Sequence, residues 1–246
     1  MTKKVVLVAA GNSGLGLPIT EFLLSRKEFK VFSTFRKNGE DLTNLFKLFD
    51  LESSTYCIKA DLRTSQDVAN VVYRLSSYGQ LWGILNFAGE ASAKRLLRTS
   101  QQEIEDLILN NVMPAVNLTT EFIKYASTNQ KTGGRMVHIS SVTVRRPVPG
   151  TIPYVIAKSG IEGLVKASAE ELGRYKITSN ALRLGYFDRG MAKRDVPPEM
   201  LDSISKDTAT QTLGSAESLF AAISYLLSEE SSFQTGSIID LDGGLV

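Results

Sequence analysis

The residues most suited to catalysing a reaction are a serine, a tyrosine and a lysine, Ser141, Tyr154 and Lys158. The tyrosine and the lysine are four residues apart, so a helix through this segment would place them on one face. A lysine ammonium beside a phenol stabilises the phenolate, and we therefore expect Lys158 to lower the pKa of Tyr154 from about 10. Such a tyrosine can transfer a proton near neutral pH, as reduction of a carbonyl group requires.

A glycine-rich segment near the N-terminus predicts the binding of a phosphate group. The apolar run Val5 to Ala10 predicts a buried strand, and Gly11–Gly16 leads from it into a predicted helix. Gly14 and Gly16 permit a tight turn and let the helix N-terminus approach a pyrophosphate. The spacing G-x-G-x-x-G is absent, and an ordinary strand-to-helix turn is the alternative.

The end of the second predicted strand favours a dinucleotide with an additional phosphate. A carboxylate at this place would bind the ribose hydroxyls of NAD, whereas an arginine accommodates the 2′-phosphate of NADP. Phe35 stands where the carboxylate is expected, and Arg36 and Lys37 follow it. The guanidinium fork suits a phosphate, so we predict NADP(H). Two surface charges in a polar turn are the alternative.

Short apolar segments alternate with longer amphipathic ones along the chain. We expect strands at Lys4–Ala9, Lys30–Phe35, Thr55–Lys59, Gly83–Phe87, Arg135–Ile139, Thr178–Leu184 and Ser237–Leu241. We expect helices at Gly14–Ser25, Glu40–Phe49, Ser65–Ser77, Gln102–Thr128, Ile152–Arg174 and Ser215–Ser228. This alternation predicts an α/β fold: a single Rossmann-type doubly wound domain over residues 1–246, with a seven-stranded parallel sheet flanked by helices on both faces. Residues 186–211 contain Pro197-Pro198 and many charges, and we expect a substrate-loop excursion there.

The composition excludes several functional classes. The chain has 246 residues, 43% of them hydrophobic, and a net charge of +2, which indicates neither nucleic-acid nor membrane binding. The single cysteine, Cys57, forms no disulfide within the chain, and we expect it in the core. The single histidine, His138, lies in a predicted strand, where a structural role is expected. We predict a cytoplasmic protein with no metal site.

Four segments, from Val5 to the C-terminal Asp242-Gly-Gly, resemble the short-chain dehydrogenase/reductase family in the same order. The segment Ala9–Gly16 resembles the family's T-G-x-x-x-G-x-G loop, and Asn86-Phe-Ala-Gly89 is similar to its N-N-A-G motif. The pair Asp61-Leu62 matches the family's residues against adenine. Asn111, Ser141, Tyr154 and Lys158 match its active-site residues. The thirteen-residue interval from serine to tyrosine, combined with Y-x-x-x-K, makes this set specific.

The resemblance implies a role for each matched residue. Ser141 would orient the substrate carbonyl, Tyr154 would donate the proton, and Lys158 would lower the tyrosine pKa and bind the nicotinamide ribose. Asn111 would hold a water that links Lys158 to solvent, and the cofactor would supply hydride. The predicted cofactor-binding residues are Gly11, Asn12, Ser13, Gly14, Leu15, Gly16, Arg36, Lys37, Asp61, Leu62, Asn86, Ala88, Gly89, Tyr154, Lys158, Gly185 and Phe187.

The chain departs from the family pattern at Ala10, Phe87, Leu184 and Arg189. Ala10 adds a methyl group where the family has glycine, and Leu184 stands for a proline. Arg189 stands for a threonine that contacts the nicotinamide amide, which predicts an altered nicotinamide clamp. We hypothesise that Arg189 instead meets an anionic part of the substrate or cofactor.

Overall similarity is greatest to 3-oxoacyl-[acyl-carrier-protein] reductases of fatty acid or polyketide biosynthesis. This resemblance implies NADPH-dependent reduction of a ketone to an alcohol, with a 3-oxoacyl thioester on acyl carrier protein or CoA as substrate, by a homodimer or homotetramer. A basic rim for an acidic carrier is one interpretation of several cations, and an ordinary charged surface is the other. These cations are Lys131, Arg135, Arg145, Arg146, Arg174 and Lys176. One alternative function is a reductase or dehydrogenase that acts on another small carbonyl or alcohol, with NAD as a possible cofactor. The other is a regulatory protein that binds a dinucleotide without catalysis.

Overall fold

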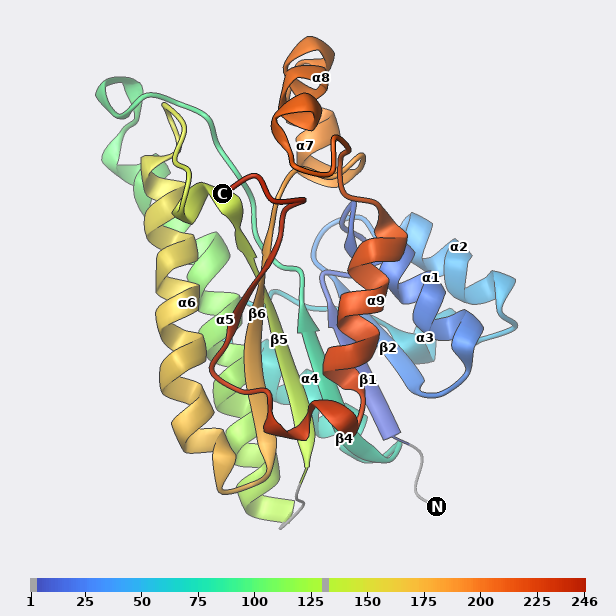
Figure 1. The fold of residues 1–246 in the computed structure, drawn as a ribbon. Helices are drawn as coiled ribbons and strands as arrows, with labels where there is room; N and C mark the ends of the chain where they lie inside the picture. Colours follow the sequence, from blue (N-terminus) through green and yellow to red (C-terminus); the bar gives the residue numbers. More distant parts are fainter. Residues whose placement is uncertain (1–3, 130–132) are drawn as a thin grey trace.

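In the computed structural model, which describes residues 4–129 and 133–246, seven parallel strands form one sheet (Figure 1). The strand order is β3-β2-β1-β4-β5-β6-β7, as expected for a doubly wound fold. The strands are β1 (Lys4–Ala9), β2 (Lys30–Phe35), β3 (Cys57–Lys59), β4 (Gln80–Asn86), β5 (Gly134–Ser141), β6 (Ile177–Leu184) and β7 (Ile238–Leu241). The order reverses between β1 and β4, and ligands of such sheets bind beyond the strand C-termini at this point.

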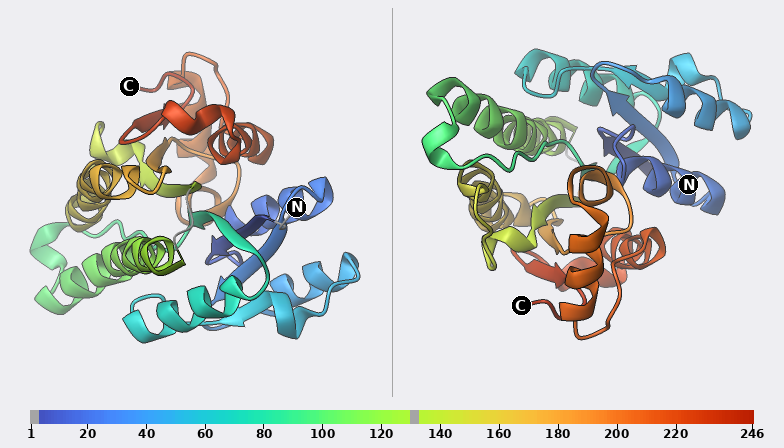
Figure 2. Two further views of the ribbon diagram at one scale, coloured as in Figure 1. Left: turned by 90° about the horizontal axis from the view of Figure 1, so that it is seen from below. Right: turned by 90° about the horizontal axis from the view of Figure 1, so that it is seen from above.

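Helices cover both faces of the sheet (Figure 2). The helices are α1 (Gly16–Arg26), α2 (Glu40–Leu48), α3 (Ser53–Tyr56), α4 (Ser65–Ser76), α5 (Gln101–Asn129), α6 (Ile152–Gly173), α7 (Gly190–Asp195), α8 (Pro198–Asp207) and α9 (Ala216–Leu227). Three short 3₁₀ turns are η1 (Leu96–Arg98), η2 (Val142–Val144) and η3 (Glu230–Phe233). Buried residues of α1, α2 and α9 pack on one face of the sheet, and those of α4, α5 and α6 pack on the other.

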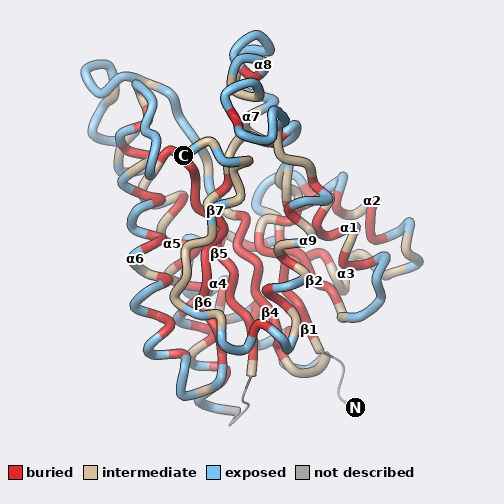
Figure 3. The backbone as a smooth tube through the Cα atoms, viewed as in Figure 1, coloured by how far each residue is buried: buried red, intermediate tan, exposed pale blue. Residues whose placement is uncertain are grey.

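The central strands are buried along most of their length (Figure 3). Strand β1 is apolar on both faces because helices cover both faces of the sheet. Val6 and Val8 of β1 point into the core beneath α1 and α9, whereas Val5 and Leu7 point into the core beneath α4 and α5. All four side chains are fully buried. This sheet is rigid at its centre, so the strand ends hold the residues that follow them in fixed positions.

Two segments differ from the sequence expectation. Thr55 and Tyr56 were expected in the third strand, but they belong to α3, where their backbone N–H groups bind the Glu52 carbonyl. The Tyr56 ring packs against Phe32 at a centroid distance of 5.0 Å, which favours this turn over an extended strand. The excursion after β6 contains two helices, α7 and α8, and Pro198 begins α8 with the backbone angle that a first helical position requires.

The C-terminal edge of the sheet carries the irregular parts of the molecule. Helices α7 and α8 stand above this edge, beside the loops that follow β4 and β5 (Figure 1). Within residues 4–129 and 133–246, no helix combines the length and apolarity needed to cross a membrane.

Candidate active site

The predicted serine, tyrosine and lysine lie together at the C-terminal end of β5. Ser141 is the last residue of that strand, and Tyr154 and Lys158 lie one turn apart near the start of α6. Tyr154 is 7% exposed and interacts with the Ser141 hydroxyl, and Lys158 is 2% exposed. The Lys158 Nζ atom lies 5.6 Å from the centre of the tyrosine ring and donates to the Ile139 carbonyl over 2.9 Å.

The pKa of Tyr154 differs from the sequence expectation. Burial raises the pKa of Tyr154 to about 12, and the hydrogen bond with Ser141 opposes this rise. Burial also lowers the pKa of Lys158 to about 8, because its ammonium has lost most of its water. Sequence reasoning was wrong about the direction for the tyrosine, since a charged neighbour can be recognised from spacing but the extent of burial cannot. In this structure the phenol stays protonated, and the lysine changes charge near neutral pH.

Asn111 presents an unpaired acceptor beside the lysine. Its Nδ2 atom donates to the carbonyls of Leu107 and Glu90, whereas its buried Oδ1 atom has no hydrogen-bond partner. A Cβ atom on Gly89 would lie 2.5 Å from this Oδ1 and 3.3 Å from Lys158 Nζ. The two polar atoms therefore flank Gly89, and only a glycine fits between them. A buried acceptor without a partner suits a water or a ligand hydroxyl, as predicted for Asn111.

The glycine-rich loop is tightly folded between β1 and α1. Gly16 is required because a Cβ there would lie 2.6 Å from the Ala10 carbonyl oxygen. Ala10 has a φ of 57°, a left-handed conformation that an L-residue adopts at a cost. A Cβ on Gly14 would lie 2.3 Å from the Cα atom of Gly190, so the start of α7 rests directly on the loop. Ala10 therefore holds a conformation that a glycine would adopt without this cost.

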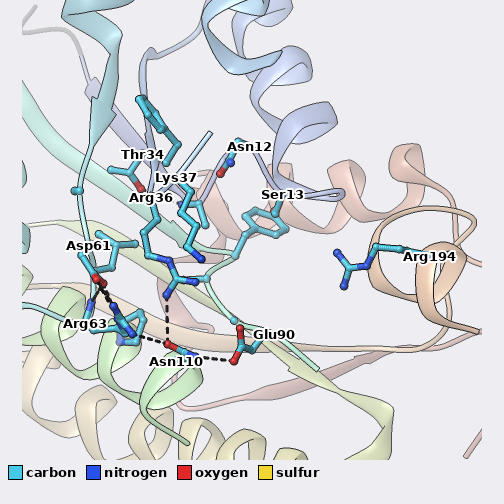
Figure 4. Close-up of a pocket in the computed structure, with 18 residues that line it drawn as sticks. Asn12, Ser13, Thr34, Arg36, Lys37, Asp61, Arg63, Glu90, Asn110 and Arg194 are labelled. Carbon is cyan, nitrogen blue, oxygen red and sulfur yellow. Dashed lines mark hydrogen bonds and ion pairs between the residues drawn. The ribbon is translucent and has the colours of Figure 1, made fainter. Parts of the chain in front are cut away.

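A cavity of about 340 Å³ lies at the switch point, beyond β1, β2, β3 and β4 (Figure 4). The predicted cofactor residues that line it are Asn12, Ser13, Arg36, Lys37, Asp61, Leu62, Ala88 and Gly89. The cavity fits the adenosine half of a dinucleotide. Its polar side chains can donate hydrogen bonds, Ala88 and Gly89 leave space for the ligand, and Arg36 and Lys37 carry positive charge. Sequence reasoning missed five polar lining residues, Arg63, Glu90, Asn110, Thr34 and Arg194. The first three each adjoin a predicted residue, but only the fold brings them together.

Several predicted cofactor residues do not line this cavity. Gly11, Gly14, Leu15 and Gly16 shape the phosphate loop, and Tyr154 and Lys158 belong to the cluster around Ser141. Gly185 packs against Asp242, where a Cβ would lie 2.7 Å from the Asp242 Cα. The Phe187 side chain is 2% exposed and lies in the core.

Asn86 has a structural role together with His138. Its Oδ1 accepts from the Ala88 N–H, and its Nδ2 lies 3.2 Å from Nδ1 of His138. Because an amide N–H donates, Nδ1 is the acceptor and Nε2 carries the proton toward Thr119 Oγ1. Burial, with a smaller effect of the Lys158 charge, lowers the pKa of His138 to about 3. The expected structural role of the histidine is confirmed, since a neutral imidazole orients the residue that holds the loop after β4.

Among the described residues, the cations considered for a basic rim do not gather at one place, which favours the other interpretation, an ordinary charged surface. Arg145 pairs with Asp240 over 2.9 Å and Arg146 pairs with Asp207 over 3.3 Å, so carboxylates neutralise both. Arg135 is buried and donates to the Ser228 carbonyl. Arg135, Arg174 and Lys176 lie near the N-terminal ends of β5 and β6, at the opposite edge of the sheet from Ser141. Lys131 lies outside the described residues.

Comparison with known proteins finds sequence relatives that are named as reductases. A family model described as enoyl-(acyl carrier protein) reductase matches residues 9–246. The 3-oxoacyl-[acyl-carrier-protein] reductase of Thermotoga maritima is 27% identical over 245 residues, which cover 99% of this chain and 98% of the relative. The acetoacetyl-CoA reductase of Rhizobium meliloti is 28% identical over 243 residues, 98% of each chain. A structure of actinorhodin polyketide ketoreductase with NADPH superposes on this chain with a TM-score of 0.87 at 24% sequence identity. The match covers 99% of this chain and 97% of the ketoreductase chain, and it confirms the fold.

Proposed function

The chain belongs to the short-chain dehydrogenase/reductase family, and from this premise we propose that it reduces a ketone to an alcohol with NADPH. The observation that carries the proposal is the convergence of Ser141, Tyr154 and Lys158 beside Asn111 and Gly89. The family and the fold support NAD(P) binding in the neighbouring cavity. The choice of NADPH is supported by Arg36 and Lys37, which line the cavity where an NAD-selecting carboxylate would stand.

The side chains of the cluster provide orientation and a proton. NADPH, when bound, supplies the hydride that no side chain can provide. The Ser141 oxygen accepts from the Thr143 hydroxyl over 2.9 Å, so its own proton points away from Thr143, toward the Tyr154 oxygen in this structure and toward a carbonyl oxygen when substrate is bound. Tyr154, with a pKa of about 12, holds its proton until the carbonyl oxygen gains negative charge and becomes the stronger base.

Lys158 and Asn111 would replace the proton that the tyrosine loses. With a pKa of about 8, Lys158 carries a proton at neutral pH and releases it readily. The unpaired Oδ1 of Asn111 would hold a water next to this ammonium. The pair thus supports a relay from solvent to Tyr154, in the roles that the family resemblance implies.

We propose a 3-oxoacyl thioester, carried on acyl carrier protein or CoA, as the substrate. The support is the names of the relatives, which include reductases of both kinds. The alternatives are another small carbonyl or alcohol and a regulatory protein that binds a dinucleotide without turnover. A homodimer or homotetramer is supported by α6, where Ile156 is 53% exposed and a Cβ on Gly163 would meet nothing within 4 Å. The cytoplasmic location stays a prediction.

The test is NADPH oxidation with a panel of 3-oxoacyl-CoA and carrier-linked thioesters and simple ketones. We expect turnover of at least one thioester, and a loss of at least about 100-fold in Tyr154→Phe, because general acid catalysis typically contributes about 10²–10⁴. NADPH affinity of the variant should stay within about threefold of the wild type, since the phenylalanine keeps the ring in place. Tight NADPH binding without turnover of any compound would support the regulatory alternative.

A further inference from the structure

Two arginine side chains meet on one amide oxygen at the outer end of the cavity (Figure 4). Arg36 and Arg63 donate to Oδ1 of Asn110 over 3.3 Å and 3.1 Å. The Nδ2 atom of the same amide donates to the Glu90 carboxylate over 2.6 Å. Because a guanidinium only donates and a carboxylate only accepts, this network fixes the orientation of the amide. Asn110 therefore holds the two guanidinium groups side by side.

The fold explains why residues this far apart in sequence meet. Arg36 follows β2 and Arg63 follows β3, and the two strands are neighbours in the sheet. The Ala60 N–H continues their pairing by donating to the Phe35 carbonyl over 3.0 Å, so both chains leave the sheet at the same level. Asn110 reaches this edge from α5. Each of the three groups is thus supported by a different element.

The charges of this cluster are only partly balanced. Arg63 binds the Asp61 carboxylate through Nε and NH2, and this contact lowers the pKa of Asp61. Within the described parts of the chain, no carboxylate forms an ion pair with Arg36 or Lys37. Two adjacent guanidinium groups repel each other, and a bound anion relieves that repulsion. Arg36 and Lys37 are therefore able to bind an anion without first breaking an ion pair.

Space for such an anion lies next to the two arginines. A second cavity, of about 430 Å³, is lined by Arg36, Lys37, Arg63 and Asn110, and also by the carboxylate residues Asp61, Glu90 and Asp106. Asp61 and Glu90 are already bound to Arg63 and Asn110. Among residues 4–129 and 133–246, Arg36 donates to one neutral acceptor, the Asn110 amide oxygen, so most of its five N–H donors remain for binding oxygen atoms of a ligand. A phosphate offers several acceptors and two negative charges, which guanidinium forks match.

We propose that Arg63 and Asn110 complete the subsite for the 2′-phosphate of the cofactor, in addition to Arg36 and Lys37. Arg63 contributes a second guanidinium, and Asn110 positions both arginines. This inference rests on the proposed use of NADPH. It differs from the simpler interpretation, in which Arg63 only supports Asp61 beside the adenine and contributes equally to NADPH and NADH.

Direct binding of cofactor fragments separates these interpretations. Calorimetric titration would compare 2′,5′-ADP, which carries the additional phosphate, with 5′-AMP, which lacks it. We expect Arg63→Ala to weaken 2′,5′-ADP about tenfold and to change 5′-AMP less than about twofold, since one charged hydrogen-bonding group is lost. Asn110→Ala should weaken 2′,5′-ADP by a smaller factor. Glu90→Gln should tighten it a few-fold, because the amide keeps an acceptor for Asn110 and removes a negative charge.

Two controls keep the experiment decisive. Lys59 is exposed, lies at the same edge of the sheet and lines neither cavity. Lys59→Ala therefore removes one positive charge outside the site and should leave the affinities for 2′,5′-ADP and 5′-AMP unchanged. Arg63→Lys keeps the positive charge but loses the paired N–H donors of the guanidinium group. We therefore expect its affinity for 2′,5′-ADP to lie between those of the wild type and Arg63→Ala, and this variant serves as the test if the alanine variant folds poorly.

Equal weakening of both fragments by Arg63→Ala, or no effect on either, would overturn the proposal. So would equal affinity of the wild type for the two fragments, which would also remove the NADPH assignment. The fragments contain no nicotinamide, so these results do not depend on ketone turnover. Failure of the reductase proposal would appear separately, as missing turnover in a protein that still distinguishes the two fragments.

Discussion

Replacing Ala10 by glycine should stabilise the protein, although it deletes a side chain. Ala10 has a φ of 57°, which costs a non-glycine residue roughly 1–2 kcal/mol. Glycine avoids this cost but has more freedom to lose on folding, which offsets roughly 0.5–1 kcal/mol. The hydrogen bond from the Ala10 N–H to Thr34 Oγ1, at 3.0 Å, involves only backbone and Thr34 atoms and survives the change. The net gain should be about 0.5–1 kcal/mol.

Thermal and urea unfolding would measure this gain. For a chain of this size, about 1 kcal/mol corresponds to roughly 2–4 °C in Tm. Lys27→Gly is a matched control, because Lys27 has a φ of 59° at the end of α1, far from the cavity, and should gain a similar amount. Ala9→Gly is the opposite control. Ala9 lies in β1, where glycine should cost about 1 kcal/mol.

The reasoning would be refuted if Ala10→Gly destabilised the protein as much as Ala9→Gly does. That result would mean that residue 10 is not left-handed in solution and that the loop differs from the one described. NADPH affinity should stay within about threefold of the wild type, because the cavity gains only the space of a methyl group. A large loss of affinity with unchanged stability would instead give the methyl group a direct role in cofactor binding.

Two further predictions concern buried charges. Burial lowers the pKa of His138 in the folded chain to about 3, against 6.5 for a solvated imidazole, so the unfolded chain binds more protons between these values. Stability should therefore be complete above pH 6.5 and fall by up to about 4–5 kcal/mol as pH approaches 3. Denaturant titrations at several pH values test this, and an equally steep loss in His138→Gln would contradict it. Glu162, whose side chain is 11% exposed, binds both Arg183 and the Ser140 hydroxyl, so Glu162→Gln should cost about 3 kcal/mol in urea unfolding. Combining it with Arg183→Leu should cost less than the sum of the single changes, and strict additivity would argue against coupling.

The fold class and the cluster of Ser141, Tyr154 and Lys158 could be predicted because both depend on local order along the chain. Alternating apolar strands and amphipathic helices specify a doubly wound sheet, since each element must bury its own apolar face. Tyr154 and Lys158 share a face by helical periodicity alone, and Ser141 follows from its place at the end of a strand. The phosphate loop was recognisable for the same reason, although Ala10 replaces a glycine.

Tertiary structure decided the charges and the long-range partners. Arg36, Arg63 and Asn110 meet because β2 and β3 are neighbours and the N-terminal part of α5 lies nearby, and no short-range pattern contains that arrangement. Arg145 and Arg146 seemed available for a partner until the fold placed carboxylates beside them. The pKa of Tyr154 rises because every packed atom around it displaces water. Spacing identifies which groups are neighbours on one element, whereas desolvation and pairing between elements are properties of the whole folded chain.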